Sequence, residues 1–298
     1  MSAEPRRGIR SPAGRAGDTA SLGPPAVPPA VVGLLAAIGS DDTGIRVLAS
    51  AVSEFPSVAA RLLMLANSAW SAPARPITSV HDACLRLGLR VVRSVSLAMA
   101  VARPFDPNRC RGFDVVRYWS TALLTAEGAA LLSSRLLPHD PDCDEGTLRS
   151  AGLLHNLGLL WLADRWPLST SEALAAAASG ACLEDALHAS VGMDHREAAG
   201  ALGRAWGLPA PLVAAMRYHA TPGYRGDHWR VAAACGLASS LVERLERAPE
   251  GPADVEGLDP SDLVAPGVVG EMWTALAARR EAVAALTTCL FGEASLRR

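Results

Sequence analysis

The adjacent residues His155 and Asn156, within the run 151–158, are the first candidates for chemistry in this chain. An imidazole followed by a carboxylate can hold a divalent cation and tune the water molecule bound to it. Asparagine has the shape of aspartate but carries no negative charge. A His-Asn pair keeps the imidazole of such a site but lacks the charged group that would hold a hard cation.

Four other positions place a histidine beside an acidic residue. One of them also carries a helix-start signal, because Asp194 and Glu197 have the spacing of a capping box. His81-Asp82 is expected on the solvated face of a short helix, and His139-Asp140 and Asp227-His228 are expected in loops. We assign these three pairs no chemistry. The four pairs are His81-Asp82, His139-Asp140, Asp194-His195 and Asp227-His228.

Composition argues against a polyanionic partner. The chain has 298 residues, half of them hydrophobic and 19% charged, with a formal net charge of -2. All 28 basic residues are arginine, and they form no basic stripe. A nucleic-acid binder would be expected to concentrate positive charge on one face. We therefore expect a globular protein with a sizeable core that does not bind nucleic acid.

The cysteines indicate a reducing compartment. None of the six forms a CxxC pair, and no spacing is typical of a zinc site. They are Cys84, Cys110, Cys143, Cys182, Cys235 and Cys289. No apolar stretch is long enough to cross a membrane, and four prolines interrupt the uncharged residues 19–40, so we expect neither a membrane helix nor a secretion signal. The predicted location is the cytoplasm.

Helical periodicity dominates from residue 27 onward, and no alternating strand pattern is found, so the predicted fold class is all-α. Two predicted features matter most below: Asp41, Asp42 or Thr43 should cap a helix that ends at Ser53, and residues 147–165 should form one apolar helix. The other helices are expected at 56–66, 79–88, 89–101, 113–137, 194–207, 209–219, 229–247 and 268–290.

Three regions follow from this pattern. Residues 1–26 are rich in Pro, Gly and Arg and are predicted to be a disordered tail. Residues 27–105 are predicted to form an N-terminal helical part, and residues 106–293 a larger helical bundle that includes the C-terminal helices.

Four ordered groups of segments carry a resemblance to a known family. They are 62–69 with 77–80 and 85–88; 118–120; 152–158; and 194–197 with 206–209 and 218–219. In this order and spacing, from residue 30 to 240, the chain resembles the HDOD family, a regulatory offshoot of the HD superfamily. The resemblance implies a multi-helix HD-like bundle with an N-terminal helical subdomain. It also implies structural roles for the family-motif residues Asn67, Ser68, Trp119, Gly158, Trp206 and Pro209.

The resemblance also implies where metal ligands would lie in an HD phosphohydrolase. Such an enzyme needs an early histidine, a His-Asp pair and a later aspartate around the metal. At these places the chain has Thr121 (after Ser120), His155-Asn156 and Ser239. With three ligands of four replaced, we expect no catalytic residue, no metal and no other cofactor.

His195 and His219 follow the family pattern and could approach His155. One interpretation is a remnant pocket for a small anion, a nucleotide or a weakly held metal. The favoured interpretation is that each imidazole bonds a neighbouring backbone carbonyl or helix end. Asn67 also has two interpretations. It could line the interface between the N-terminal helices and the rest of the chain, but we expect it to end a helix in a left-handed turn.

Three functions can be weighed against these residues. The leading hypothesis is a non-catalytic module of bacterial signalling that binds a partner protein, or a small nucleotide signal, through the degenerate HD cleft. The alternative is a metal-dependent phosphohydrolase or phosphodiesterase with an unorthodox HD site. A nucleic-acid binder is the third, and the balanced charge opposes it.

Overall fold

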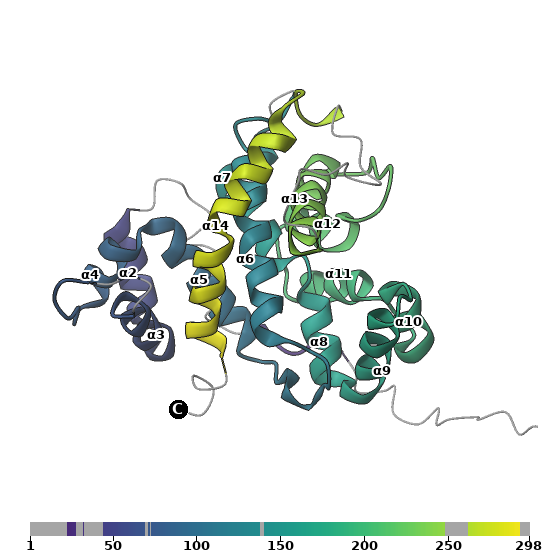
Figure 1. The fold of residues 1–298 in the computed structure, drawn as a ribbon, viewed down its shortest axis with the longest axis horizontal. Coiled ribbons are helices and arrows are strands. Elements are labelled where there is room, and N and C mark those ends of the chain that lie inside the picture. Colours follow the sequence, from purple (N-terminus) through teal and green to yellow (C-terminus); the bar gives the residue numbers. More distant parts are fainter. Residues whose placement is uncertain are drawn as a thin grey trace, which may run out of the picture.

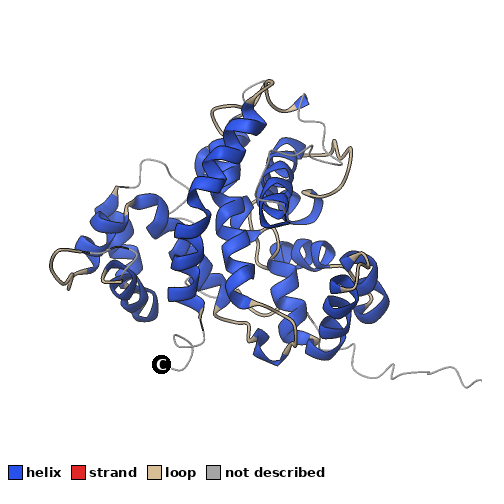
Figure 2. Cartoon of the chain, in the orientation of Figure 1, coloured by secondary structure: helices blue, strands red, loops and turns tan. Residues whose placement is uncertain are grey.

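The computed structural model of the chain describes residues 23–27, 32, 44–68, 71, 73–137, 140–247 and 262–292. Within these ranges the regular elements are helices, apart from an isolated antiparallel bridge between Leu136 and Val264 (Figure 2). The predicted all-α class is confirmed. Residues 1–22 of the predicted tail, and the capping candidates Asp41, Asp42 and Thr43, lie outside the described residues.

The first four labelled helices pack together on one side of the molecule (Figure 1). Local signals fix several of their ends: Pro56 starts α3 at its first turn, and the Ser79 side chain accepts from the backbone N–H of Asp82 at the start of α4. The N-cap of α2 is Gly44, one residue beyond the predicted candidates. These helices are α2 (Ile45–Ser53), α3 (Pro56–Ala66), α4 (Val80–Leu87) and α5 (Leu89–Ala102).

Asn67 joins the end of α3 to the loop that precedes α4. Its Nδ2 donates to the carbonyls of Leu63 and Ile77, and its Oδ1 accepts from the Ile77 N–H, each at 2.8 Å. The predicted left-handed turn is wrong, because Asn67 has φ -100° and ψ 0°. The side chain imitates a backbone pairing partner for Ile77, and this does not require a left-handed residue.

We expect Asn67→Ala to lower the free energy of unfolding by about 1–2 kcal/mol, since three hydrogen bonds are lost at once. Ser68→Ala is the matched control, because the Ser68 hydroxyl makes one local bond, to the Leu65 carbonyl at 2.7 Å. Urea denaturation of both variants measures the difference. Equal stability of the two variants would show that the Asn67 side chain does not hold the loop.

The centre of the molecule is built around α6 (Val115–Leu131), which packs against α7 (Glu145–Leu154), α13 (Trp229–Arg247) and α14 (Val268–Phe291). Figure 1 shows α14 lying along α6 despite their separation in the chain. The Trp119 ring stacks on Phe291 with centroids 4.9 Å apart, and the Ser120 hydroxyl lies 2.5 Å from that of Thr287. Trp119 is 1% exposed and is part of the core.

The remaining helices form the other side of the molecule (Figure 1). They are α8 (Leu157–Arg165), α9 (Pro167–Ala178), α10 (Leu183–Val191), α11 (His195–Ala205) and α12 (Ala210–Tyr218), with short 3-10 turns η2 (Pro107–Arg109) and η3 (Pro141–Cys143). The predicted capping box at Asp194 and Glu197 is confirmed and starts α11. None of the described helices combines the length and apolar character needed to cross a membrane.

The single helix predicted over 147–165 is wrong. The chain leaves helical geometry at Asn156, which has φ -102° and ψ 12°, directly after His155 at the end of α7, so α7 and α8 are separate helices. They lie in the upper and lower parts of Figure 1. The break falls at the pair singled out for chemistry, and it directs the two side chains into the interior between several helices.

Candidate functional site

His155 lies at the C-terminal end of α7 and is completely buried. Gly152, one turn earlier, allows α7 to approach α6 closely: a Cβ there would lie 2.7 Å from the Thr125 carbonyl oxygen. This approach places the His155 ring deep in the bundle, among α6, α7, α12 and α13.

The hydrogen bonds of His155 define its tautomer. Nδ1 lies 2.7 Å from the Gly152 carbonyl oxygen, which can only accept, so Nδ1 carries the proton. Nε2 is then an acceptor, and it lies 3.4 Å from the hydroxyl of Ser239, which can donate. His219 bonds the same way, with Nδ1 3.0 Å from the Ala215 carbonyl, and its ring meets His155 edge to face at 5.0 Å. Both imidazoles are therefore bonded to local backbone carbonyls.

His195 approaches from α11 and differs from the other two. It is 6% exposed, yet its Nδ1 has no hydrogen-bond partner among the described residues. Gly158 is what lets α11 come so close to α8, because a Cβ at Gly158 would lie 2.0 Å from the His195 carbonyl oxygen and 2.4 Å from the Ala199 nitrogen. The family-motif glycine thus positions the histidine through backbone contact.

Burial keeps this cluster uncharged. Desolvation lowers the pKa of His155 to about 4, and it lowers the pKa of His219 well below the ordinary value. Desolvation also lowers the pKa of His195, although the nearby carboxylates of Glu184 and Asp194 oppose the effect. A buried cluster of three neutral imidazoles offers no fixed charge to a reacting phosphate at neutral pH.

Few polar side chains of α6 and α8 lie close to the histidine cluster. Asn156 is half-buried, and its Oδ1 is buried without a hydrogen-bond partner in the described part of the chain. Thr121 is half-buried, and its neighbour Ser120 faces α14. The part of α6 closest to Gly152 is at Thr125, one turn later, whose buried hydroxyl also has no partner among the described residues. Sequence reasoning missed Thr125, although it is the only hydroxyl in the run 122–132.

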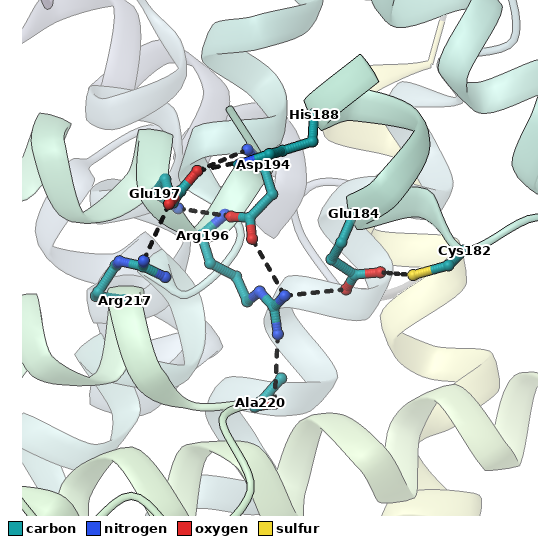
Figure 3. A network of polar contacts seen from close by, with 8 residues as sticks. All are labelled: Cys182, Glu184, His188, Asp194, Arg196, Glu197, Arg217 and Ala220. Carbon is teal, nitrogen blue, oxygen red and sulfur yellow. Dashed lines mark hydrogen bonds and ion pairs between the residues drawn. The ribbon is translucent and has the colours of Figure 1, made fainter. Parts of the chain in front are cut away.

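The carboxylates that influence His195 are engaged in structural contacts (Figure 3). Asp194 Oδ1 accepts from the backbone N–H groups of Arg196 and Glu197, each at 2.8 Å, and its Oδ2 pairs with the Arg196 guanidinium at 3.1 Å. Glu184 accepts from the Cys182 thiol at 2.9 Å and lies 3.9 Å from Arg196. Both carboxylates therefore serve the start of α11 and the junction with α10.

These residues do not fit an HD-type metal centre. Within the described ranges, no three or more His, Cys, Asp or Glu side chains gather so that they could hold a metal ion. Where the family resemblance implies the two other ligands, the chain has Thr121 and Ser239, and Asn156 offers a neutral oxygen in place of an aspartate. Hard divalent cations need several oxygen ligands, preferably charged.

The remaining family-motif residues have structural positions. Trp206, at the end of α11, donates from Nε1 to the Pro25 carbonyl at 2.8 Å, and its ring stacks on Phe105 at 6.2 Å. Pro209 is the N-cap of α12. The three histidines of the cluster come from the segments 152–158, 194–197 and 218–219, which carried part of the resemblance.

A family model for the HDOD domain matches residues 25–222. This chain is a member of the HDOD family. Among curated proteins, no match was found. The sequence resemblance is thereby confirmed, and the HDOD match ends within the loop that follows α12.

Solved structures share the fold of this HDOD protein. A protein provisionally named for signal transduction, from Marinobacter aquaeolei VT8, aligns with a TM-score of 0.73 and 24% identity. The alignment covers 89% of this chain but 59% of that protein, so this chain spans less than two thirds of its length. A provisionally named phosphohydrolase from Shewanella amazonensis SB2B aligns at 0.66 and 22%, covering 89% and 94% of the two chains. An HDOD domain protein of unknown function from Geobacter sulfurreducens aligns at 0.66 and 21%, covering 90% and 93%.

Proposed function

We propose that this HDOD protein is a non-catalytic regulatory module of bacterial signalling, located in the cytoplasm, that binds a protein partner or a small signal. The proposal is supported mainly by the kinds of side chain that lie around His155, where an HD enzyme would bind its metal. This region holds the neutral imidazoles of His155 and His219, the Ser239 hydroxyl and the Asn156 amide, and the described residues bring no group of three or more possible metal ligands together there. The name given to the Marinobacter protein supports a signalling role.

The geometry also bears on where a ligand would bind. The three histidines are between 0% and 6% exposed. The cavity beside His219 has about 10 Å³, which is room for one water at most. The degenerate HD cleft is closed by packing in this arrangement. We therefore propose that the histidine cluster stabilises the bundle and that binding takes place on other surfaces.

A metal and turnover assay decides between this proposal and an unorthodox phosphohydrolase. The full chain is purified, dialysed and analysed for iron, manganese and zinc, and it is then incubated with bis(p-nitrophenyl) phosphate and added Mn²⁺. We expect metal well below one equivalent and no release of p-nitrophenol above the protein-free rate. Stoichiometric metal together with turnover would establish the enzyme instead.

Asn156→Asp restores the carboxylate of the HD pair, and we expect it to create no phosphodiesterase activity. One added carboxylate beside one imidazole leaves the other ligand positions filled by Thr121 and Ser239, so the metal still lacks donors. The assay is the one above, with Asn156→Ala as the matched control for the lost amide. Measurable turnover by the aspartate variant alone would mean that other ligands exist.

The proposal excludes nucleic acid as the partner. Most non-specific affinity for nucleic acid comes from counterion release, which depends on the number of phosphates that basic side chains contact. The arginines form no basic stripe in the sequence, and the net charge is -2, so we expect few such contacts. A mobility-shift assay with duplex DNA and single-stranded RNA at low and moderate salt should detect no complex. A partner protein is sought by co-purification, with the tagged full chain as bait.

A further inference from the structure

We infer that a cavity of about 410 Å³, away from the histidine cluster, is a binding site for a small aromatic anion. Its lining comes from α3 and α5 on one side and from η2, α6, α8 and α14 on the other. It therefore lies where the N-terminal helices meet the central bundle. The volume is within the range of roughly 300–1,000 Å³ that is usual for small-molecule sites.

Aromatic side chains concentrate on the walls of this cavity. The chain has four phenylalanines, and three of them line it: Phe55, Phe105 and Phe291. Trp119 joins them through its stacking on Phe291. In a chain with 5% aromatic residues this is a strong concentration, and offset or edge-to-face contacts from these rings suit a planar aromatic group.

The charged groups at the cavity favour a negative ligand. Arg61 and Arg103 line it, and neither guanidinium forms an ion pair with a described carboxylate. Arg61 donates to the Leu290 carbonyl, which holds it in place, while Arg103 is exposed. The one lining carboxylate, Asp106, accepts through Oδ1 from the Asn108 backbone and side chain. Two lining arginines and one lining carboxylate give the lining a formal charge of +1, and the neighbouring Asp164 carboxylate accepts from the Asp106 backbone N–H at 2.9 Å.

A ligand of this class would contact both sets of helices at once. Met99 belongs to α5, and Leu160 belongs to α8, which begins directly after Asn156. Binding would therefore favour one packing of the N-terminal helices on the bundle, in proportion to the difference in affinity between packings. The role of the cavity in signalling rests on the proposed function, but the binding itself does not.

The test uses 8-anilinonaphthalene-1-sulfonate, an aromatic sulfonate, and its uncharged analogue N-phenyl-1-naphthylamine. Each is titrated into the full chain at neutral pH and followed by fluorescence. We expect saturable binding of the sulfonate, with one site per chain. Binding that does not saturate would overturn the inference. Binding of more than one probe per chain that is the same in the variants described below would also overturn it.

Two variants locate the site. Ser57→Trp places a large side chain at the cavity from an exposed position in the first turn of α3, and it should abolish binding of both probes. Arg103→Met should weaken binding of the sulfonate by about tenfold, which is the usual contribution of a charge-assisted hydrogen bond, and it should leave binding of the uncharged probe unchanged. Arg204→Met, at an exposed arginine of α11 that does not line the cavity, is the control.

Each outcome separates the inference from the proposed function. Circular dichroism and thermal melting confirm that the variants fold, and Ala102→Trp replaces Ser57→Trp if that chain does not. Undiminished binding in the tryptophan variant, or equal effects of Arg103→Met and Arg204→Met, would remove this cavity as the site and leave the metal and turnover results untouched. Turnover by the unaltered chain would instead overturn the proposed function, whatever the probe titrations give.

Discussion

Gly158→Ala is expected to lower the free energy of unfolding by about 3 kcal/mol or more, or to prevent folding altogether. A Cβ at this position would lie 2.0 Å from the His195 carbonyl oxygen and 2.4 Å from the Ala199 nitrogen. Both atoms belong to the backbone of α11, so no side-chain rotation relieves the overlap. The helices α8 and α11 would have to separate, which would expose the core beneath them.

The control for this prediction is Gly270→Ala in α14. Gly270 is also a helical glycine, but a Cβ there meets no atom within 4 Å. Alanine has the higher helix propensity, so this variant should gain up to about 1 kcal/mol. Urea unfolding of the two variants should therefore shift in opposite directions. A stable Gly158→Ala protein would mean that α8 and α11 do not pack as closely as described.

The second large effect is a loss of stability in mild acid. The pKa of His155 is lowered from 6.5 to about 4 by burial, so between these values the unfolded chain binds a proton that the folded chain does not. The contribution of His155 to the free energy of unfolding is fully present above pH 6.5 and decreases as the pH is lowered toward 4. At pH 5 the loss from His155 alone is about 2 kcal/mol. The lowered pKa values of His195 and His219 act in the same direction.

The measurement is the free energy of unfolding at several pH values from 7 to 5. His155→Asn should reduce the slope, since one of the buried imidazoles is gone, while His81→Asn removes a histidine outside the cluster and serves as the control. If His155→Asn does not fold, His219→Asn carries the same comparison. A flat profile for the unaltered chain over this range would contradict the burial of the three histidines.

Signals that act within one or two turns could be predicted from the sequence. Pro56, Ser79 and the Asp194–Glu197 capping box fix helix starts through contacts between near neighbours, and the structure has them as expected. The family resemblance then supplied the bundle, and the structure places His155 beside His219 and Ser239.

Features that depend on packing between distant helices could not be predicted. The break at His155 and Asn156 has no proline or glycine at the turn itself, so periodicity alone continues the helix through it. The two faces of the alanine-rich helix α9 differ little in hydrophobicity, so periodicity did not indicate where this helix begins and ends. The cavity joins Phe55, Phe105 and Phe291, which no local pattern connects.

The position of α14 has a consequence for synthesis of the chain. Its contacts with α6 join residues 167 positions apart, as between Ser120 and Thr287. Until α14 has been synthesised and has left the ribosome, the Trp119 face of α6 has no Phe291 to cover it. We therefore expect nascent chains to expose this apolar face until α14 has packed onto α6, and we expect chaperones to bind it.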